Sequence, residues 1–164
     1  MKLACLLALL PIVAGASILA PRDGPAPVVT EIATFKTSVT SFSKQIPIPG
    51  GYRLVGAINP GTISGKISGT IQGGTSAPSF VNNATQIIAD IEIYGITDDG
   101  YPFFIAETGT GLNGANPFYN HEMIQIGGEY AYLASTSLLD ALVSINTPSG
   151  GADISGTIYT LTDP

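Results

Sequence analysis

A two-residue alternation of apolar and polar side chains is the feature that most limits how this chain can fold. In the stretch TISGKISGTIQGG, Thr62 to Gly74, the alternate positions are Ile63, Gly65, Ile67, Gly69 and Ile71. Successive side chains of a β-strand point to opposite faces, so this pattern predicts a strand over 62–71 with one apolar face. The two glycines on that face indicate either a coiled barrel corner, which we expect, or room inside for a ligand.

Segments rich in Ile, Val, Thr and Tyr continue along the chain between clusters of Gly, Pro and Asn. They predict strands at 31–42, 52–58, 62–71, 86–96, 101–108, 119–126, 129–134 and 152–161. The segment 135–146 fits either a helical turn that begins at Ser137 or another strand. About eight strands in a chain of 164 residues predict an all-β fold. We expect a single closed or nearly closed antiparallel barrel, with a sandwich as the alternative.

The beginning of the chain is typical of a secretory signal peptide over residues 1–16. Lys2 precedes the apolar run Leu3–Val13 and the small residues Ala14-Gly15-Ala16, and the run is too short to span a membrane. Cleavage after Ala20 is the alternative. We therefore expect a protein of the secretory pathway that is secreted, with an extended or disordered leader at 17–30 and a barrel domain at 31–164.

Cysteine content and charge exclude several kinds of protein. The single cysteine, Cys5, leaves with the signal peptide, so the mature domain must be stabilised by its own core. Six Lys and Arg residues, one of them Lys2, stand against twelve Asp and Glu residues. Nucleic acids and anionic membranes are bound by basic patches, so we expect neither as a partner.

Glycosylation is predicted at one position. Asn83-Ala84-Thr85 is the only acceptor sequon, because Asn116 is followed by proline and Asn146 lacks a hydroxyl residue two positions on. We expect a glycan on Asn83.

The sequence offers little that could hold a metal or a nucleotide. His121 is the only histidine, and no G-x-S-x-G motif supplies a nucleophile. Gly109–Gly114 (GTGLNG) matches a dinucleotide-binding pattern, but Pro117 follows where a helix should begin, so we interpret it as a loop, a rim or a lid. We expect no metal and no cofactor. His121 either makes an ordinary hydrogen bond or donates a proton in a pocket.

Two carboxylates share one face of the segment 86–96. Asp90 and Glu92 alternate with Ile88, Tyr94 and Ile96. We expect this face to meet solvent; if it faced the interior, the pKa values of both carboxyls would rise and they would be site candidates. Aromatic residues gather between positions 101 and 132 and predict an apolar interior, either filled or hollow.

Several short motifs resemble a known family. They are GTISGKISGTIQGG, Asp90 on the following strand, Asp98-Asp99-Gly100, YAYLA at 130–134 and ISGTIYTL at 154–161. These motifs are similar to those of a widespread family of small calycin-like β-barrels, long labelled as a domain of unknown function. Glu92 stands where the family pattern has arginine, and tyrosine in YAYL where tryptophan is common.

The signal peptide, the missing cysteines and the sequon are similar to a secretory fungal subgroup of that family. Some of its members are hetero-Diels–Alderases that join a quinone methide, made from a tropolone or polyketide, to the terpene humulene without a cofactor. The resemblance implies a cofactor-free cyclase that binds apolar small molecules. A pericyclic step needs two oriented reactants and a hydrogen-bond donor to the heterodiene, which fits a chain without nucleophile or metal ligands. A lipocalin-like carrier and a secreted structural protein with a filled core are the alternatives.

Candidate site residues follow from the same alternation. Lys66 lies with the polar face of its segment and is expected in solvent. We predict His121 and Tyr132 as polarising donors and Arg53 with Asp90 as a supporting ion pair. Phe104, Phe118, Tyr130 and Tyr94 are predicted to line the substrate pocket.

Overall fold

The structure is a computed structural model that describes residues 26–163, so the predictions for the signal peptide and for the leader up to residue 25 lie outside the described residues. Within this range the chain forms twelve strands and one 3-10 helix. They are β1 (Val28–Val39), β2 (Ile46–Ile48), β3 (Gly51–Arg53), β4 (Gly56–Ile58), β5 (Gly61–Gly65), β6 (Gly69–Ser76), β7 (Ser79–Val81), β8 (Gln86–Thr97), β9 (Pro102–Leu112), β10 (Phe118–Ile126), η1 (Gly128–Ser135), β11 (Ser137–Asn146) and β12 (Ala152–Thr162).

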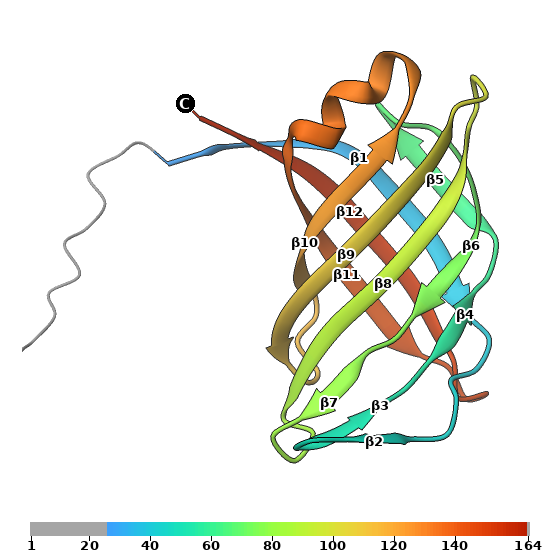
Figure 1. Ribbon diagram of the computed structural model, residues 1–164, viewed down its shortest axis with the longest axis vertical. Helices are drawn as coiled ribbons and strands as arrows, with labels where there is room; N and C mark the ends of the chain where they lie inside the picture. The colour runs from blue at the N-terminus through green and yellow to red at the C-terminus, as the bar shows by residue number, and fades with distance from the viewer. Residues whose placement is uncertain (1–25, 164) are drawn as a thin grey trace, which may run out of the picture.

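Eight of the strands in residues 26–163 close into one antiparallel barrel, which confirms the predicted fold class (Figure 1). The order around the barrel is β1, β5, β6, β8, β9, β10, β11 and β12, and β12 pairs with β1 again. Closure leaves no edge strand in this ring, so each of its strands forms backbone hydrogen bonds with two neighbours.

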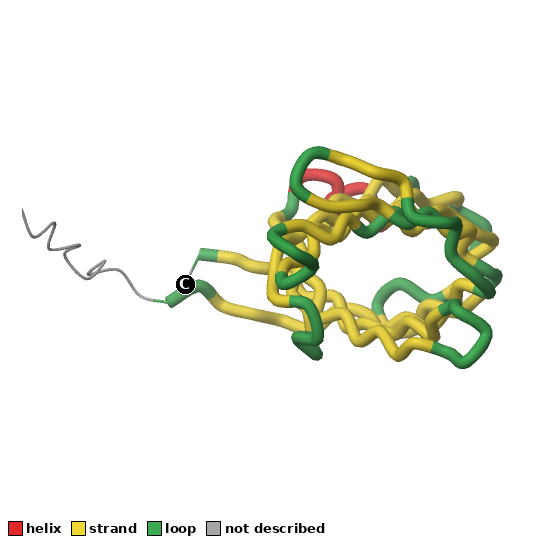
Figure 2. The backbone as a smooth tube through the Cα atoms, turned by 90° about the horizontal axis from the view of Figure 1, so that it is seen from below, coloured by secondary structure: helices red, strands yellow, loops and turns green. Residues whose placement is uncertain are grey.

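The two ends of the barrel differ. Helix η1 lies across the upper end in Figure 1, where Leu133 is buried in the core. The short strands β2, β3 and β7 lie at the lower end, from which Figure 2 views the ring of strands. The first residues of β1 pair with the last of β12, from Val28 opposite Thr162, as a ribbon that projects from the barrel. Strand β1 therefore begins inside the segment 17–30 that we assigned to the leader. Among residues 26–163, no helix is long and apolar enough to cross a membrane.

The segment predicted as one strand over 62–71 is instead a hairpin. Strands β5 and β6 pair from Gly61 opposite Ile71 to Ile63 opposite Gly69, and Lys66 is exposed in the connection. The alternation runs through this connection because Ile67 is also buried, which is why the pattern looked continuous.

The two glycines of the apolar face mark close backbone approaches, as expected for a barrel corner. A Cβ on Gly69 would lie 2.7 Å from the Cα of Thr97 on β8. Gly65 has a φ of +138° and a Cβ there would lie 2.5 Å from the carbonyl oxygen of Ile32 on β1. Any side chain at either position would push neighbouring strands apart, so these glycines let the barrel close.

Two further element predictions are wrong. Residues 129–134 belong to η1 and not to a strand. For 135–146 the strand alternative is the correct one, because 137–146 form strand β11. The segment 52–58 is divided between β3 and β4, which pair with different neighbours. The core itself is built by inward residues of every barrel strand, among them Phe35, Ile63, Ile71, Ile93, Ile124 and Ile158.

Candidate functional site

A pocket of about 570 Å³ lies at the end of the barrel opposite η1. Its walls come from the inner faces of β8, β10, β11 and β12, and from β3, β7 and the loops at this end. Ala89, Ile91, Phe118, Leu142 and Ile154 are buried lining residues and form its floor and lower walls. A pocket of this volume is in the range that holds small organic ligands, so the barrel is hollow at this end.

Aromatic and aliphatic side chains from the short strands and loops at the lower end of the barrel make up most of the rest of the wall. Tyr52 on β3 and Phe80 on β7 are cross-strand partners, and their rings stack with centroids 4.9 Å apart and planes 14° from parallel. Phe42 and Leu54 also line the pocket. The stacked pair offers a flat apolar surface with one hydroxyl, which suits an unsaturated or ring-containing ligand.

The rim carries uncharged polar groups. Asn113 and Asn116 lie in the β9–β10 loop, and Asn146 and Thr147 at the end of β11. The Asn113 side-chain amide donates to the Ala84 carbonyl at 2.9 Å, which fixes the rim to the β7–β8 turn. The lining contains no Asp, Glu, Lys, Arg or His. Amides, hydroxyls and the Tyr52 phenol are therefore the groups that can orient a ligand.

Three carboxyl groups lie inside the barrel beyond the pocket floor. Glu107 on β9 is directly opposite Glu122 on β10, and Asp140 on β11 is opposite Asn120 on β10. All four side chains are at most 1% exposed. Within residues 26–163, neither oxygen of Glu107 or Glu122 has a hydrogen-bond partner, nor does Oδ1 of Asp140, although Asn120 Nδ2 donates to Asp140 Oδ2 at 3.3 Å.

Burial raises the pKa of each of these carboxyls. For Glu107, loss of solvent is the largest cause, and the negative charges of Asp140 and Glu122 raise its pKa further. For Glu122, burial and then Asp140 raise the pKa in the same way. Burial raises the pKa of Asp140 to about 7, against the hydrogen bonds from Asn120 and its own backbone, which lower it. The group is thus arranged to hold protons. No set of three or more His, Cys, Asp or Glu side chains among residues 26–163 is arranged to hold a metal ion.

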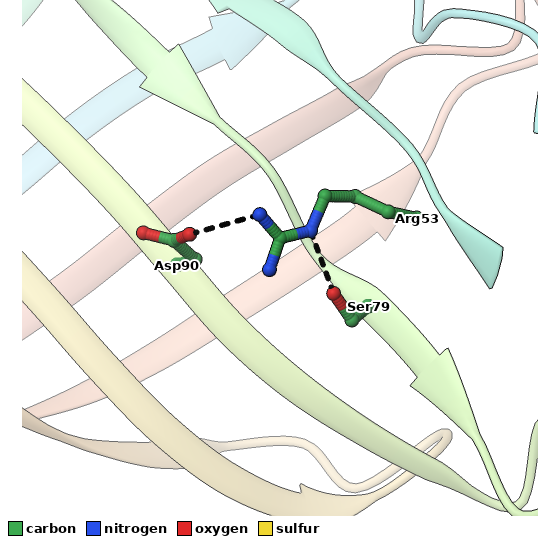
Figure 3. A network of polar contacts seen from close by, with 3 residues as sticks. All are labelled: Arg53, Ser79 and Asp90. Carbon is green, nitrogen blue, oxygen red and sulfur yellow. Dashed lines mark hydrogen bonds and ion pairs between the residues drawn. The ribbon is translucent and has the colours of Figure 1, made fainter. Parts of the chain in front are cut away.

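Arg53 and Asp90 are brought together as predicted, but outside the barrel (Figure 3). Arg53 Nη1 lies 3.6 Å from Asp90 Oδ2, and Arg53 Nε donates to Ser79 Oγ at 2.8 Å. Both charged side chains are more than 40% exposed. Asp90 and Glu92 lie on the outer face of β8, as expected, while Ala89, Ile91 and Ile93 point inward.

Of the other predicted site residues, only Phe118 lines the pocket. His121 does not face it, because the inward positions of β10 are Phe118, Asn120, Glu122 and Ile124, which leaves His121 exposed on the outer face.

The remaining aromatic residues also lie elsewhere. Phe104 and Tyr94 are neighbours on the outer faces of β9 and β8, and Tyr94 is 51% exposed. Tyr130 and Tyr132 belong to η1 at the opposite end, where Tyr130 meets Tyr101 edge to face and Tyr132 is exposed. Asn83 is exposed in the β7–β8 turn with φ of 56°, and its glycan stays a prediction.

Sequence reasoning missed the buried carboxyls, although a signal for them exists. Asp140 stands between Leu138 and Leu142 on alternate positions, and Glu122 between Asn120 and Ile124. Those patterns place the acids on the apolar face. The pocket residues of β3, β7 and the loops carry no such signal, because they meet only when the barrel closes.

Comparisons with known proteins show the fold. No protein-family model matches the chain, and no curated protein matches it. A β-barrel-like protein from Acinetobacter baumannii is similar in structure, with a TM-score of 0.70 and 17% identity over 87% of this chain and all of that one.

Two other solved structures with this barrel are an enzyme and a dirigent protein. The enzyme from Penicillium herquei has a TM-score of 0.64 and 16% identity over 87% of this chain and 99% of its own. The pterocarpan synthase dirigent protein has a TM-score of 0.51 and 10% identity over 97% of this chain and 98% of its own. The chain therefore has a β-barrel fold that also occurs in an enzyme and in a dirigent protein.

Proposed function

We propose that this chain is a cofactor-free cyclase that joins two apolar small molecules in the pocket at the open end of the barrel. The observation that carries the proposal is that pocket of about 570 Å³, with apolar walls and a rim of uncharged donors. The family resemblance of the sequence motifs supports an intermolecular hetero-Diels–Alder reaction between a quinone methide and a terpene.

The pocket suits such a step for two physical reasons. Holding two reactants in a reactive orientation replaces a bimolecular encounter, which can contribute about 7 kcal/mol or more to lowering the barrier. A hydrogen bond to the heterodiene oxygen stabilises charge that develops there, and Tyr52, Asn116 and Asn146 are among the donors that the lining provides. These three residues replace His121 and Tyr132 as the proposed polarising groups.

The test is turnover. The purified protein is mixed with humulene and a tropolone-derived quinone methide generated in solution, and the coupled product is measured by chiral chromatography. We expect a rate above the uncatalysed coupling and an excess of one enantiomer. Ala89→Phe, which fills the pocket, should abolish the excess, whereas Ala106→Phe on the outer face of β9 is the matched control and should retain it.

Two other outcomes would contradict the proposal. Saturable binding of humulene without any rate above background would identify a carrier, which the lining also fits because it contains no acid or base apart from Tyr52. Neither binding nor turnover would favour a structural role, against which the volume of the pocket now stands.

A further inference from the structure

The buried carboxyls of the barrel have no positive charge to neutralise them. Among residues 26–163, Lys36, Lys44, Lys66 and His121 are exposed, and Arg53 is 41% exposed on the outer face. An unpaired buried carboxylate loses its hydration without compensation, so it is neutralised by binding a proton.

The residues that face the carboxyls from the neighbouring strands carry no charge. The neighbours are Ile91 on β8 beside Glu107, Leu138 on β11 beside Glu122, and Ile158 on β12 beside Asp140. The opposite wall of β1, β5 and β6 buries apolar residues, among them Phe35, Ile63 and Ile71, and the uncharged Ser76. None of these neighbours titrates, so within residues 26–163 the titratable groups that face one another here are Glu107, Glu122 and Asp140, and Asp140 accepts a hydrogen bond from the Asn120 amide.

We propose that Glu107, Glu122 and Asp140 form a proton-binding site that keeps the β9–β10–β11 wall closed beneath the pocket, so that the barrel binds apolar ligands in its protonated form. Asn120 also indicates that protons are bound here. Its side chain is buried beside Asp140, and its Oδ1 has no hydrogen-bond partner among residues 26–163. Protons on the carboxyls turn acceptors into donors, which can then satisfy these oxygens within the cluster.

The pocket is connected to this site through two strands. Phe118 in the pocket floor lies two residues before Asn120 and four before Glu122 on β10, and its cross-strand partner Leu142 lies two residues after Asp140 on β11. All of these side chains point inward. Water drawn in to hydrate ionised carboxylates would have to separate the side chains that make the floor.

The direction of the pH dependence follows from the raised pKa values. Between the pKa of an unfolded carboxyl, about 4, and the raised pKa of the folded one, the folded protein holds more protons than the unfolded protein. The stability is therefore fully present below about pH 4 and is lost as the pH rises through the folded pKa, which for Asp140 is about 7. We expect a barrel that is more stable at pH 5 than at pH 8.

The first experiment uses the wild-type protein. Unfolding by urea in weakly buffered solution at pH 7 should release about two or more protons per chain, measured with a pH indicator. Thermal melting should give a midpoint lower by on the order of 10 °C at pH 8 than at pH 5. Release of less than about half a proton would overturn the proposal, whatever the variants do.

The second experiment uses neutral variants. Glu107→Gln with Glu122→Gln imitates the protonated pair and should reduce the pH dependence of the melting midpoint by at least half. Glu92→Gln, an exposed carboxyl on β8, is the matched control and should leave it unchanged. An unchanged slope in the double variant, or recovery of the pH 8 midpoint with millimolar Ca²⁺ or Mg²⁺, would overturn the proposal, the latter by identifying a cation site.

The third experiment measures the pocket with N-phenyl-1-naphthylamine as an uncharged fluorescent probe. Its affinity should fall at least fivefold from pH 5 to pH 8 in the wild type and less than twofold in the double variant. This third experiment rests on the proposed function, in which the pocket is the ligand site. The measurements of proton release and of melting do not depend on it. Loss of probe binding at both pH values with intact proton release would thus count against the proposed function, and pH-independent probe binding against the coupling of the two sites.

Discussion

The barrel has two opposed walls that share one alternation pattern and differ in what they bury. The wall of β1, β5 and β6 presents Phe35, Ile63 and Ile71 to the interior. Neighbouring backbone leaves no space for a side chain at Gly65, beside β1, or at Gly69, beside β8. The wall of β9, β10 and β11 presents Glu107, Glu122 and Asp140 at the same depth of burial. We call β1, β5 and β6 the dry wall and β9, β10 and β11 the acidic wall. The dry wall is stabilised by apolar packing, whereas the stability of the acidic wall depends on protons bound to its carboxyls.

The two walls therefore differ in how their stability depends on pH. Apolar packing is nearly independent of pH, so the first wall provides a fixed frame. The stability of the second wall depends on pH, because its buried carboxyls have no counter-charges. That wall supplies Phe118 and Leu142 to the pocket. We therefore expect the two walls to respond differently to substitution and to pH.

The largest effect is expected for Phe35→Ala in the dry wall. Phe35 is 2% exposed and pairs with Ile63 across β1 and β5, so its loss leaves a cavity in close packing. The free energy of unfolding should fall by about 3–5 kcal/mol. Urea titration at pH 5 and pH 8 measures it. A loss that differed by more than about 1 kcal/mol between the two pH values would show that this wall also depends on protons.

A smaller loss is expected for Gly69→Ala. The added Cβ would lie 2.7 Å from the Cα of Thr97, which is backbone and cannot rotate away. Strands β6 and β8 must therefore separate, and overpacking of this kind costs about 1–3 kcal/mol. Gly127→Ala is the control for replacing a glycine of ordinary φ, because Gly127 has a φ of −95° and a Cβ there would lie 3.6 Å from Cδ1 of Tyr101, an ordinary contact. Equal losses in both variants would contradict the close approach as the cause.

Part of the dry wall was predictable from sequence, because alternation alone identified Ile63 and Gly69 as inward residues, whereas Gly65 is exposed at the end of β5. The hairpin between Gly65 and Gly69 was not, since the buried Ile67 continues the same period through the connection. The pocket was least predictable. Tyr52 and Phe80 come from strands of three residues that gain their partners only on closure, and His121 was assigned to the wrong face of β10 although Glu122 beside it held the inward position.

An increase in stability is expected for Glu107→Met in the acidic wall. Methionine has a similar length, fills irregular space and has no charge to desolvate. At pH 8 the free energy of unfolding should rise by about 1–2 kcal/mol, because the cost of burying or protonating Glu107 disappears. At pH 5, where the pKa raised by burial keeps Glu107 protonated, the gain should be smaller. A net loss at pH 8 would mean that the carboxyl makes stabilising contacts in the ionised form.

The smallest effect is expected for the outer pair of Arg53 and Asp90, in which the carboxylate has both a positive partner and access to water. The two atoms are 3.6 Å apart and both side chains are more than 40% exposed, so solvent already stabilises each charge without its partner. A double-mutant cycle of Arg53→Ala and Asp90→Ala should give a coupling of at most about 0.5 kcal/mol, weaker still at high salt. The probe affinity of the pocket should change less than twofold, because neither residue lines it. A coupling above about 1.5 kcal/mol would show that the outer pair is not screened by solvent and would contradict the contrast between charges inside and outside the barrel. A loss of product formation in Arg53→Ala would favour the supporting role in the site that the sequence predicted for this pair.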